Sequence, residues 1–172
     1  MNLDRLDHIL RLLWMLVMTV WLRRSNVAVW IVSLGWVVLL FNNFNGPQLI
    51  PRIIFIRIVG AILTTSGLVF AVWARFYLGS SWDAFITFKL DHKLIRTGPY
   101  AIVRHPISVG FMLALIGSVL NFGHLRSVVA ATMVTSAWTY KAGLEESFMM
   151  ERFGSEYEQY CHHVKKLIPK IW

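Results

Sequence analysis

The chain has 172 residues, enough for one domain, and 56% of them are hydrophobic. Only 15% are charged, whereas soluble domains carry about 25%, so the composition indicates a protein surrounded by lipid. The net charge of +8 lies between apolar runs, which favours an anionic membrane surface over nucleic acid as the partner. Cys161 is the single cysteine, which excludes a disulfide within the chain.

Five segments approach the roughly 20 apolar residues that a bilayer-spanning helix needs. They are residues 3–22, 26–41, 53–78, 106–122 and 127–142. The first has Asp4 and Asp7 at its head and no small-residue cleavage site after it, so we expect a retained helix rather than a signal peptide. The short link at 123–126 predicts an antiparallel hairpin of the last two helices. The predicted fold is all-α: a polytopic integral membrane protein with about five transmembrane helices.

Two segments, 79–103 and 143–172, are too polar for lipid, and 145–160 is predicted to form a mostly polar helix. With five spans, both segments lie on the side that collects twelve of the 17 Lys and Arg residues. Positive charge accumulates on the cytosolic side of membrane proteins. We therefore expect both polar segments, and with them the C-terminus, to face the cytosol.

The first informative motif occupies 91–106 and reads Asp-His-Lys-Leu-Ile-Arg-Thr-Gly-Pro-Tyr-Ala-Ile-Val-Arg-His-Pro. Gly98-Pro99 predicts a turn, and Pro106 suits the first position of a helix, where its missing N–H would have no partner. The free N–H groups that follow form a weak anion site, and Arg104 adds a fixed charge beside them. A ligand with a carboxylate, such as the methionyl end of S-adenosylmethionine, suits this arrangement.

The second motif runs from Lys141-Ala142-Gly143-Leu144-Glu145-Glu146 to Tyr160. Lys141 and Glu145 are four residues apart, so they share one face if the fifth helix continues through Gly143. That face would lie at the membrane boundary, where ionisable groups are costly unless they are paired or functional.

Together the two motifs resemble the isoprenylcysteine carboxyl methyltransferase family and its relatives among the phospholipid methyltransferases. The family pattern is roughly H-x-L-V-x-S-G-P-Y-x-x-V-R-H-P-x-Y-x-G, then a helix with R-x-x-x-E-E, then F-G-x-x-Y-x-x-Y. The matching positions are His92, Leu94, Gly98, Pro99, Tyr100, Val103, Arg104, His105, Pro106, Gly110, Glu145, Glu146, Phe153, Gly154, Tyr157 and Tyr160. R-H-P alone also occurs in membrane sterol reductases, but both blocks in order are far more specific.

The resemblance implies a membrane enzyme that takes S-adenosylmethionine from the cytosol and methylates a lipophilic acceptor, such as the carboxylate of a prenylcysteine-like compound. With Arg104 added for its charge, the expected cofactor contacts are His92, Lys93, Leu94, Ile95, Tyr100, Arg104, His105, Pro106, Ile107, Ser108 and Glu145. Glu145 and Lys141 are the expected catalytic residues, and Lys141 is assigned to the acceptor. We expect one methyltransferase domain over 1–172, with three helices in 1–78 and the catalytic part in 79–172.

Two positions depart from the family pattern. Ser108 replaces the usual tyrosine of R-H-P-x-Y, and Lys141 replaces the arginine. Lysine keeps the positive charge but lacks the planar fork that binds a carboxylate through two hydrogen bonds. The departure at Lys141 therefore bears on a carboxylate acceptor more than on the cofactor.

Each candidate residue also has a simpler interpretation when it is taken alone. Arg104 is then an anchor at the membrane surface, and Lys141 with Glu145 is a surface ion pair. The ordered combination favours a cofactor site. An NAD(P)H-dependent membrane reductase and a non-catalytic membrane subunit stay open as alternative functions, and the histidine spacing predicts no metal site.

Overall fold

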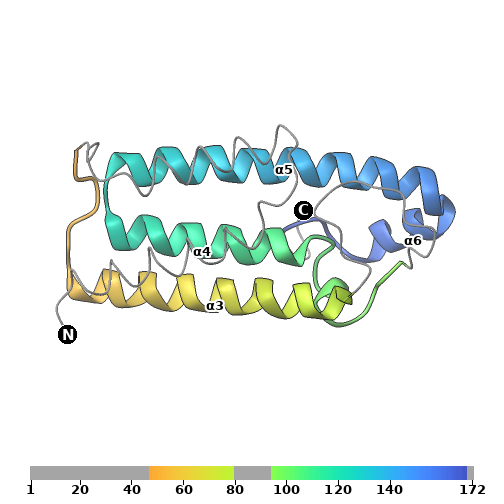
Figure 1. Ribbon diagram of the computed structural model, residues 1–172, viewed down its shortest axis with the longest axis horizontal. Coiled ribbons are helices and arrows are strands. Elements are labelled where there is room, and N and C mark those ends of the chain that lie inside the picture. Colours follow the sequence, from red (N-terminus) through yellow and green to blue (C-terminus); the bar gives the residue numbers. More distant parts are fainter. Residues whose placement is uncertain (1–46, 80–93, 170–172) are drawn as a thin grey trace.

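The computed structural model describes residues 47–79 and 94–169, and most of these residues are helical. The elements in chain order are α3 (Ile54–Leu78), the short 3-10 helix η2 (Gly98–Ala101), α4 (Pro106–Phe122), α5 (Leu125–Phe153) and α6 (Ser155–His163). Helices α3, α4 and α5 run lengthwise beside one another, and α6 lies near the far end of α5 (Figure 1). The predicted helices at 3–22 and 26–41 lie outside the described residues.

The predicted third and fourth helices are confirmed, to within one residue, as α3 and α4. Within the described part of the chain, α3 is the one helix with the length and apolar composition needed to cross a membrane, and α4 is apolar but shorter, at 17 residues. The outward side chains of α3 fit a lipid-facing surface, since Phe55 and Phe76 are 71% and 78% exposed.

The prediction for the fifth helix was wrong in its extent. Helix α5 begins at Leu125 and continues through Gly143 to Phe153. A single glycine costs a helix only about 1 kcal/mol, and the residues that follow it are mostly good helix formers. The expected single polar helix at 145–160 is also wrong, because Gly154, with φ of 50°, ends α5 and α6 begins anew at Ser155.

Helices α3 and α4 are joined by a seam of small residues, which we define as Gly60, Thr64, Gly67 and Ala71 facing Gly110, Ala114 and Gly117. A Cβ atom on Gly67 would lie 2.5 Å from the Gly110 carbonyl oxygen, so the two backbones are nearly in contact. The hydroxyl of Thr64 donates to the Gly60 carbonyl at 2.9 Å. Small residues that admit such close approach are typical of helix pairs in membranes.

The predicted antiparallel hairpin of α4 and α5 is confirmed. Gly123, in the left-handed region at φ of 66°, ends α4 and lets the chain reverse within two residues. The rings of Phe111 and Trp138 stack between the two helices with centroids 5.3 Å apart. This hairpin sets the far half of α5 over the start of α4, where the two sequence motifs meet.

Candidate functional site

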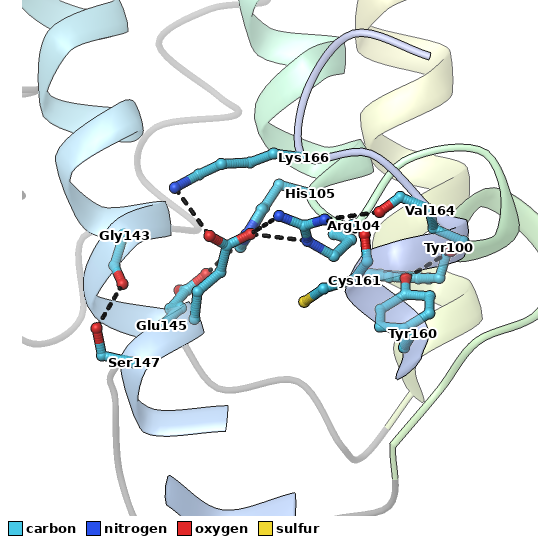
Figure 2. Close-up of polar contacts among 11 residues, drawn as sticks. Tyr100, Arg104, His105, Gly143, Glu145, Ser147, Tyr160, Cys161, Val164 and Lys166 are labelled. Atoms are coloured by element: carbon cyan, nitrogen blue, oxygen red, sulfur yellow. Dashed lines mark hydrogen bonds and ion pairs between the residues drawn. The ribbon is translucent and has the colours of Figure 1, made fainter. Parts of the chain in front are cut away.

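The Arg-His-Pro turn lies between η2 and α4 and is bordered by the last described residues of the chain. The backbone N–H of Arg104 donates to the Lys165 carbonyl at 2.9 Å, and that of His105 to the Lys166 carbonyl at 3.2 Å. The segment after α6 therefore runs along the turn (Figure 2). Arg104 and Val164, which are 60 positions apart in the sequence, are thus neighbours at one end of the bundle.

The continued helix α5 brings two adjacent carboxylates to this turn. Nδ1 of His105 lies 3.5 Å from Oε2 of Glu145, and Nε2 lies 3.2 Å from Oε1 of Glu146. The His105 side chain is only 9% exposed. A neutral imidazole has one N–H donor, whereas an imidazolium has two. An acceptor beside each ring nitrogen therefore fits a doubly protonated His105.

Lys141 and Glu145 form the ion pair that a helix continuous through Gly143 predicts. Their Nζ and Oε1 atoms are 2.7 Å apart, and both side chains are partly buried. The Lys141 ammonium also lies 5.4 Å from the ring centroid of Trp138, one turn earlier on α5. Lys141 thus stands where the apolar half of α5 meets its charged half.

Glu146 contacts three cations, counting His105. Nε and Nη2 of Arg104 reach its Oε1 at 2.8 and 2.7 Å, and Nζ of Lys166 reaches its Oε2 at 3.0 Å. Neither Glu146 nor Lys166 was among the predicted site residues. The second glutamate of the R-x-x-x-E-E pattern was a usable signal for Glu146, whereas the sequence around Lys166 carries none that we can identify.

Arg104 also holds the end of α6. Its Nη1 donates to the carbonyl of Val164 at 2.6 Å and to that of Cys161 at 3.2 Å, as Figure 2 shows. Cationic side chains stabilise helix C-termini by binding the last carbonyls in this way. The guanidinium is therefore engaged on two sides by the protein, and a cofactor contact by Arg104 stays a prediction.

The charge cluster shifts the pKa values of its members. Burial opposes ionisation of Glu145, but the contacts from His105 and Lys141 outweigh it and lower the Glu145 pKa to about 2. For Glu146 the contacts from His105, Lys166 and Arg104 outweigh burial in the same way, and its pKa also falls to about 2. Burial by itself would lower the pKa of His105, yet the two carboxylates raise it above 6.5.

Tyr100 links three elements at the same end of the bundle. Its hydroxyl lies 3.5 Å from the Ala74 carbonyl of α3, and its own carbonyl accepts a 2.5 Å hydrogen bond from the Tyr160 hydroxyl of α6. Burial is the largest cause that raises the pKa of both phenols. Tyr100 is thus held in place at this end of the bundle by contacts with α3 and α6.

The other predicted residues fall into three groups. Pro106, Ile107 and Ser108 are buried in the first turn of α4, and Leu94 and Ile95 are partly buried in the segment before η2. His92 and Lys93 lie outside the described residues. The side chains that the structure brings together are those of His105, Arg104, Glu145 and Lys141. Across residues 47–79 and 94–169, no three His, Cys, Asp or Glu side chains could share a metal ion.

Residues 55–156 match the family model of the phospholipid methyltransferases. The chain belongs to the phospholipid methyltransferase family. The match begins in α3 and ends in α6, so it includes the Arg-His-Pro turn and both glutamates.

Several relatives are isoprenylcysteine O-methyltransferases. A probable protein-S-isoprenylcysteine O-methyltransferase of Oryza sativa subsp. indica is 32% identical over 122 residues, which are 68% of this chain and 63% of that protein. The protein-S-isoprenylcysteine O-methyltransferase of Schizosaccharomyces pombe is 35% identical over 82 residues, 47% of this chain and 35% of its own. The chain thus spans less than two thirds of the length of these relatives.

A solved structure shares the architecture. It is that of the eukaryotic intramembrane Ras methyltransferase ICMT, with a TM-score of 0.63 and 25% sequence identity, covering 82% of this chain and 51% of that one. The expected likeness to isoprenylcysteine carboxyl methyltransferases is therefore confirmed, and with it the assignment to an all-helical membrane protein fold.

Proposed function

We propose that this chain is an integral membrane methyltransferase that transfers a methyl group from S-adenosylmethionine to a lipophilic acceptor, such as a prenylcysteine-like carboxylate. One observation carries the proposal: His105, in the Arg-His-Pro turn, contacts Glu145 and Glu146, which lie about 41 positions away on α5. The two blocks on which the family resemblance rests are thus one cluster. The names of the relatives support methyl transfer over the reductase and the non-catalytic subunit.

The charges of the cluster fit the methionyl end of S-adenosylmethionine. Arg104, Lys141, Lys166 and protonated His105 supply four positive charges, and Glu145 and Glu146 supply two negative ones. The surplus of positive charge suits the carboxylate of the cofactor. Glu145, whose side chain is 33% exposed, is assigned to the ammonium group of the cofactor, from which it would accept hydrogen bonds.

When bound, S-adenosylmethionine supplies a methyl group that is already activated by the sulfonium, so transfer needs alignment and exclusion of water more than acid or base catalysis. The chain's contribution is a rigid turn at the start of α4 and the carboxylates that fix it. With both ring nitrogens on carboxylates, His105 contributes a positive charge rather than a proton acceptor. No metal is required for this chemistry.

The acceptor is assigned to Lys141. Its side chain is 14% exposed, lies beside Trp138 and faces Glu145, at the boundary between the apolar and charged halves of α5. A lipophilic acceptor that enters from the bilayer would meet this ammonium first among the charges in the second half of α5. Because lysine is a point charge, it tolerates more acceptor geometries than the arginine of the family pattern.

The remaining parts of the proposal concern the whole chain. We infer one domain over 1–172 with about five spans, from the apolar segments of the sequence. We infer that the site and the C-terminus face the cytosol, from the excess of Lys and Arg on that side. A cysteine placed at Gln159 in α6, with Cys161 replaced by serine, tests the orientation. It should react with a membrane-impermeant maleimide only after the cells are opened, and labelling of intact cells would reverse the assignment.

The activity is tested on the full chain purified in detergent. Calorimetry should show binding of S-adenosylmethionine and none of NADPH, and radiolabelled methyl groups should reach a prenylcysteine analogue such as N-acetyl-S-farnesylcysteine. His105→Ala and Glu145→Gln should weaken cofactor binding about tenfold or more. Lys141→Ala should raise KM or lower kcat and leave cofactor affinity mostly intact.

Glu151→Gln is the matched control, since Glu151 is an exposed carboxylate on the same helix. Full activity and cofactor affinity in this variant separate a specific loss from a general effect of removing charge from α5. Cofactor affinity that is unchanged in both His105→Ala and Glu145→Gln would contradict the assigned site, and binding of NADPH alone would favour the reductase.

A further inference from the structure

Adjacent carboxylates on α5 have different surroundings. Glu145 contacts Lys141 and one ring nitrogen of His105, and its side chain is 33% exposed. Glu146 is 20% exposed, and its two oxygens are shared among the other ring nitrogen of His105, Arg104 and Lys166. Glu145 therefore has two protein partners and the more exposed side chain, whereas Glu146 has three partners and the less exposed one.

The charge cluster around Glu146 joins three parts of the chain. His105 and Arg104 belong to the turn before α4, Glu146 to α5, and Lys166 to the segment that follows α6 (Figure 2). Backbone hydrogen bonds from Arg104 and His105 to the carbonyls of 165 and 166 close the same assembly from the other side. Glu146 is thus the side chain through which the turn, the helix and the tail are joined.

We propose that Glu146 is a positioning residue of the methyltransferase site, which holds His105 as a doubly protonated, immobile cation by fastening it between α5 and the C-terminal segment. Glu146 itself makes no contact with cofactor or acceptor. This inference rests on the proposed function, because it assumes that the His105 cation helps to bind the cofactor.

The charged groups around His105 set the sign of the expected effect. Glu145 and Glu146 face its two nitrogens, Arg104 and Lys166 approach the far side of Glu146, and Lys141 approaches Glu145. Both direct neighbours are anions, and the cations act on the ring through them. Removal of either anion should therefore favour the neutral ring, and removal of a cation should favour the charged ring.

The test is the titration of His105 in the full-length protein without cofactor, followed by NMR of 15N- and 13C-labelled histidine and assigned with a His105→Asn variant. Glu146→Gln should lower the His105 pKa by about one unit or more, since one of its two anionic partners is lost. Glu146→Asp keeps the charge and should restore a large part of this shift. Glu151→Gln should leave the titration unchanged.

Cofactor binding provides the second measurement. Affinity for S-adenosylhomocysteine should fall about tenfold or more in Glu146→Gln, recover in part in Glu146→Asp and stay unchanged in Glu151→Gln. If Glu146 served only to stabilise the fold, the variant would melt at a lower temperature with an unchanged His105 titration, and that outcome would overturn the proposal.

A variant on the tail keeps the proposal open to test if Glu146→Gln does not fold. Lys166→Met removes a cation from Glu146, so the His105 pKa should rise, and a fall or no change would contradict the proposed role of Glu146. Failure of the proposed function is a separate result. A wild-type protein that binds no S-adenosylmethionine would refute the cofactor and leave the titration of His105 as measured.

Discussion

The seam between α3 and α4 and the charged end of the bundle are held together by different physics. In the seam, uncharged small residues let two backbones come so close that an added Cβ on Gly67 or Gly117 would lie 2.4–2.5 Å from a carbonyl oxygen. At the charged end, Arg104, His105 and Glu146 bind through ion pairs and hydrogen bonds between long side chains. The seam therefore depends on side-chain volume. The charged end, which we define as Arg104, His105, Glu145, Glu146 and Lys166 with their partners, depends on charge.

This difference indicates how the molecule divides its tasks. Close packing has low compressibility and tolerates little change in side-chain volume, so it suits a part that only has to stay in place. A network of long side chains binds through charge and can exchange a partner for a charged ligand without rebuilding a helix contact. Variants that alter volume should therefore damage the first region, and changes of charge or pH should damage the second.

The largest difference in stability is expected when one glycine in each region is replaced by alanine, which adds a single methyl group. Gly67→Ala should lower stability by about 1–3 kcal/mol, because the new Cβ meets the Gly110 backbone, which cannot move aside cheaply. Gly143→Ala in α5 should be neutral or stabilising by about 0.5–1 kcal/mol, because its Cβ meets only the Lys166 ammonium, at 3.9 Å. The measurement is the thermal unfolding midpoint of both variants in one detergent.

The two glycine variants act as controls for each other, since each makes the same chemical change within a helix. Equal midpoints would mean that the α3–α4 seam is not as tight as the Cβ distances require. A large loss in Gly143→Ala alone would mean that the charged end, too, is limited by volume.

The sequence predicted the seam's helices better than the charged end. Apolar runs fix α3 and α4 to within a residue, because helix length in lipid follows from hydrophobicity alone. The end of α5 at Phe153 was missed, since a polar stretch after Gly143 reads equally well as a new helix or as a continued one. Gly154 was the available signal: glycine is the usual residue just after a helix end.

The roles of the site residues, too, were predicted only in part. The likeness to a family picked out His105 and Glu145, which the structure brings into contact. Lys166 was missed because its contact with Glu146 depends on the path of the chain after α6, which no local pattern encodes. Arg104 was expected to add a fixed charge for the ligand, and its contacts with Glu146 and with the carbonyls at the end of α6 were not predicted. Long-range ion pairs of this kind cannot be read from residue spacing.

A smaller and local effect is expected from pH. The pKa of Glu146 falls from 4.5 to about 2 in the folded chain, so its contribution is complete above pH 4.5 and is lost as the pH falls toward 2. His105 has a raised pKa, so its contribution is complete below pH 6.5 and is lost as the pH rises through the folded value. The charged end should therefore be most stable between about pH 4.5 and 6.5.

Hydrogen exchange, corrected for the intrinsic pH dependence of amide exchange, measures this difference between the regions. Amides of α6 should lose protection on both sides of that window, and amides of α4 beside Ala114 should keep theirs, because no seam residue titrates. Parallel loss in α4 and α6 would show that the two regions unfold as one unit, and the comparison between them would then fail.

The smallest effect is expected where the charged end is held by a neutral hydrogen bond. Tyr160→Phe removes the 2.5 Å bond to the Tyr100 carbonyl and should lower stability by about 1 kcal/mol, since both groups are buried and the carbonyl would lose its partner. Tyr140→Phe is the control, because Tyr140 is 64% exposed and its hydroxyl should contribute little.

Thermal midpoints of the two variants test stability, and calorimetry with S-adenosylhomocysteine tests function. Because the bond joins α6 to η2 without involving a charge of the cluster, cofactor affinity in Tyr160→Phe should change less than twofold. A tenfold loss of affinity would mean that placement of Tyr100, rather than charge alone, decides cofactor binding at this end of the bundle.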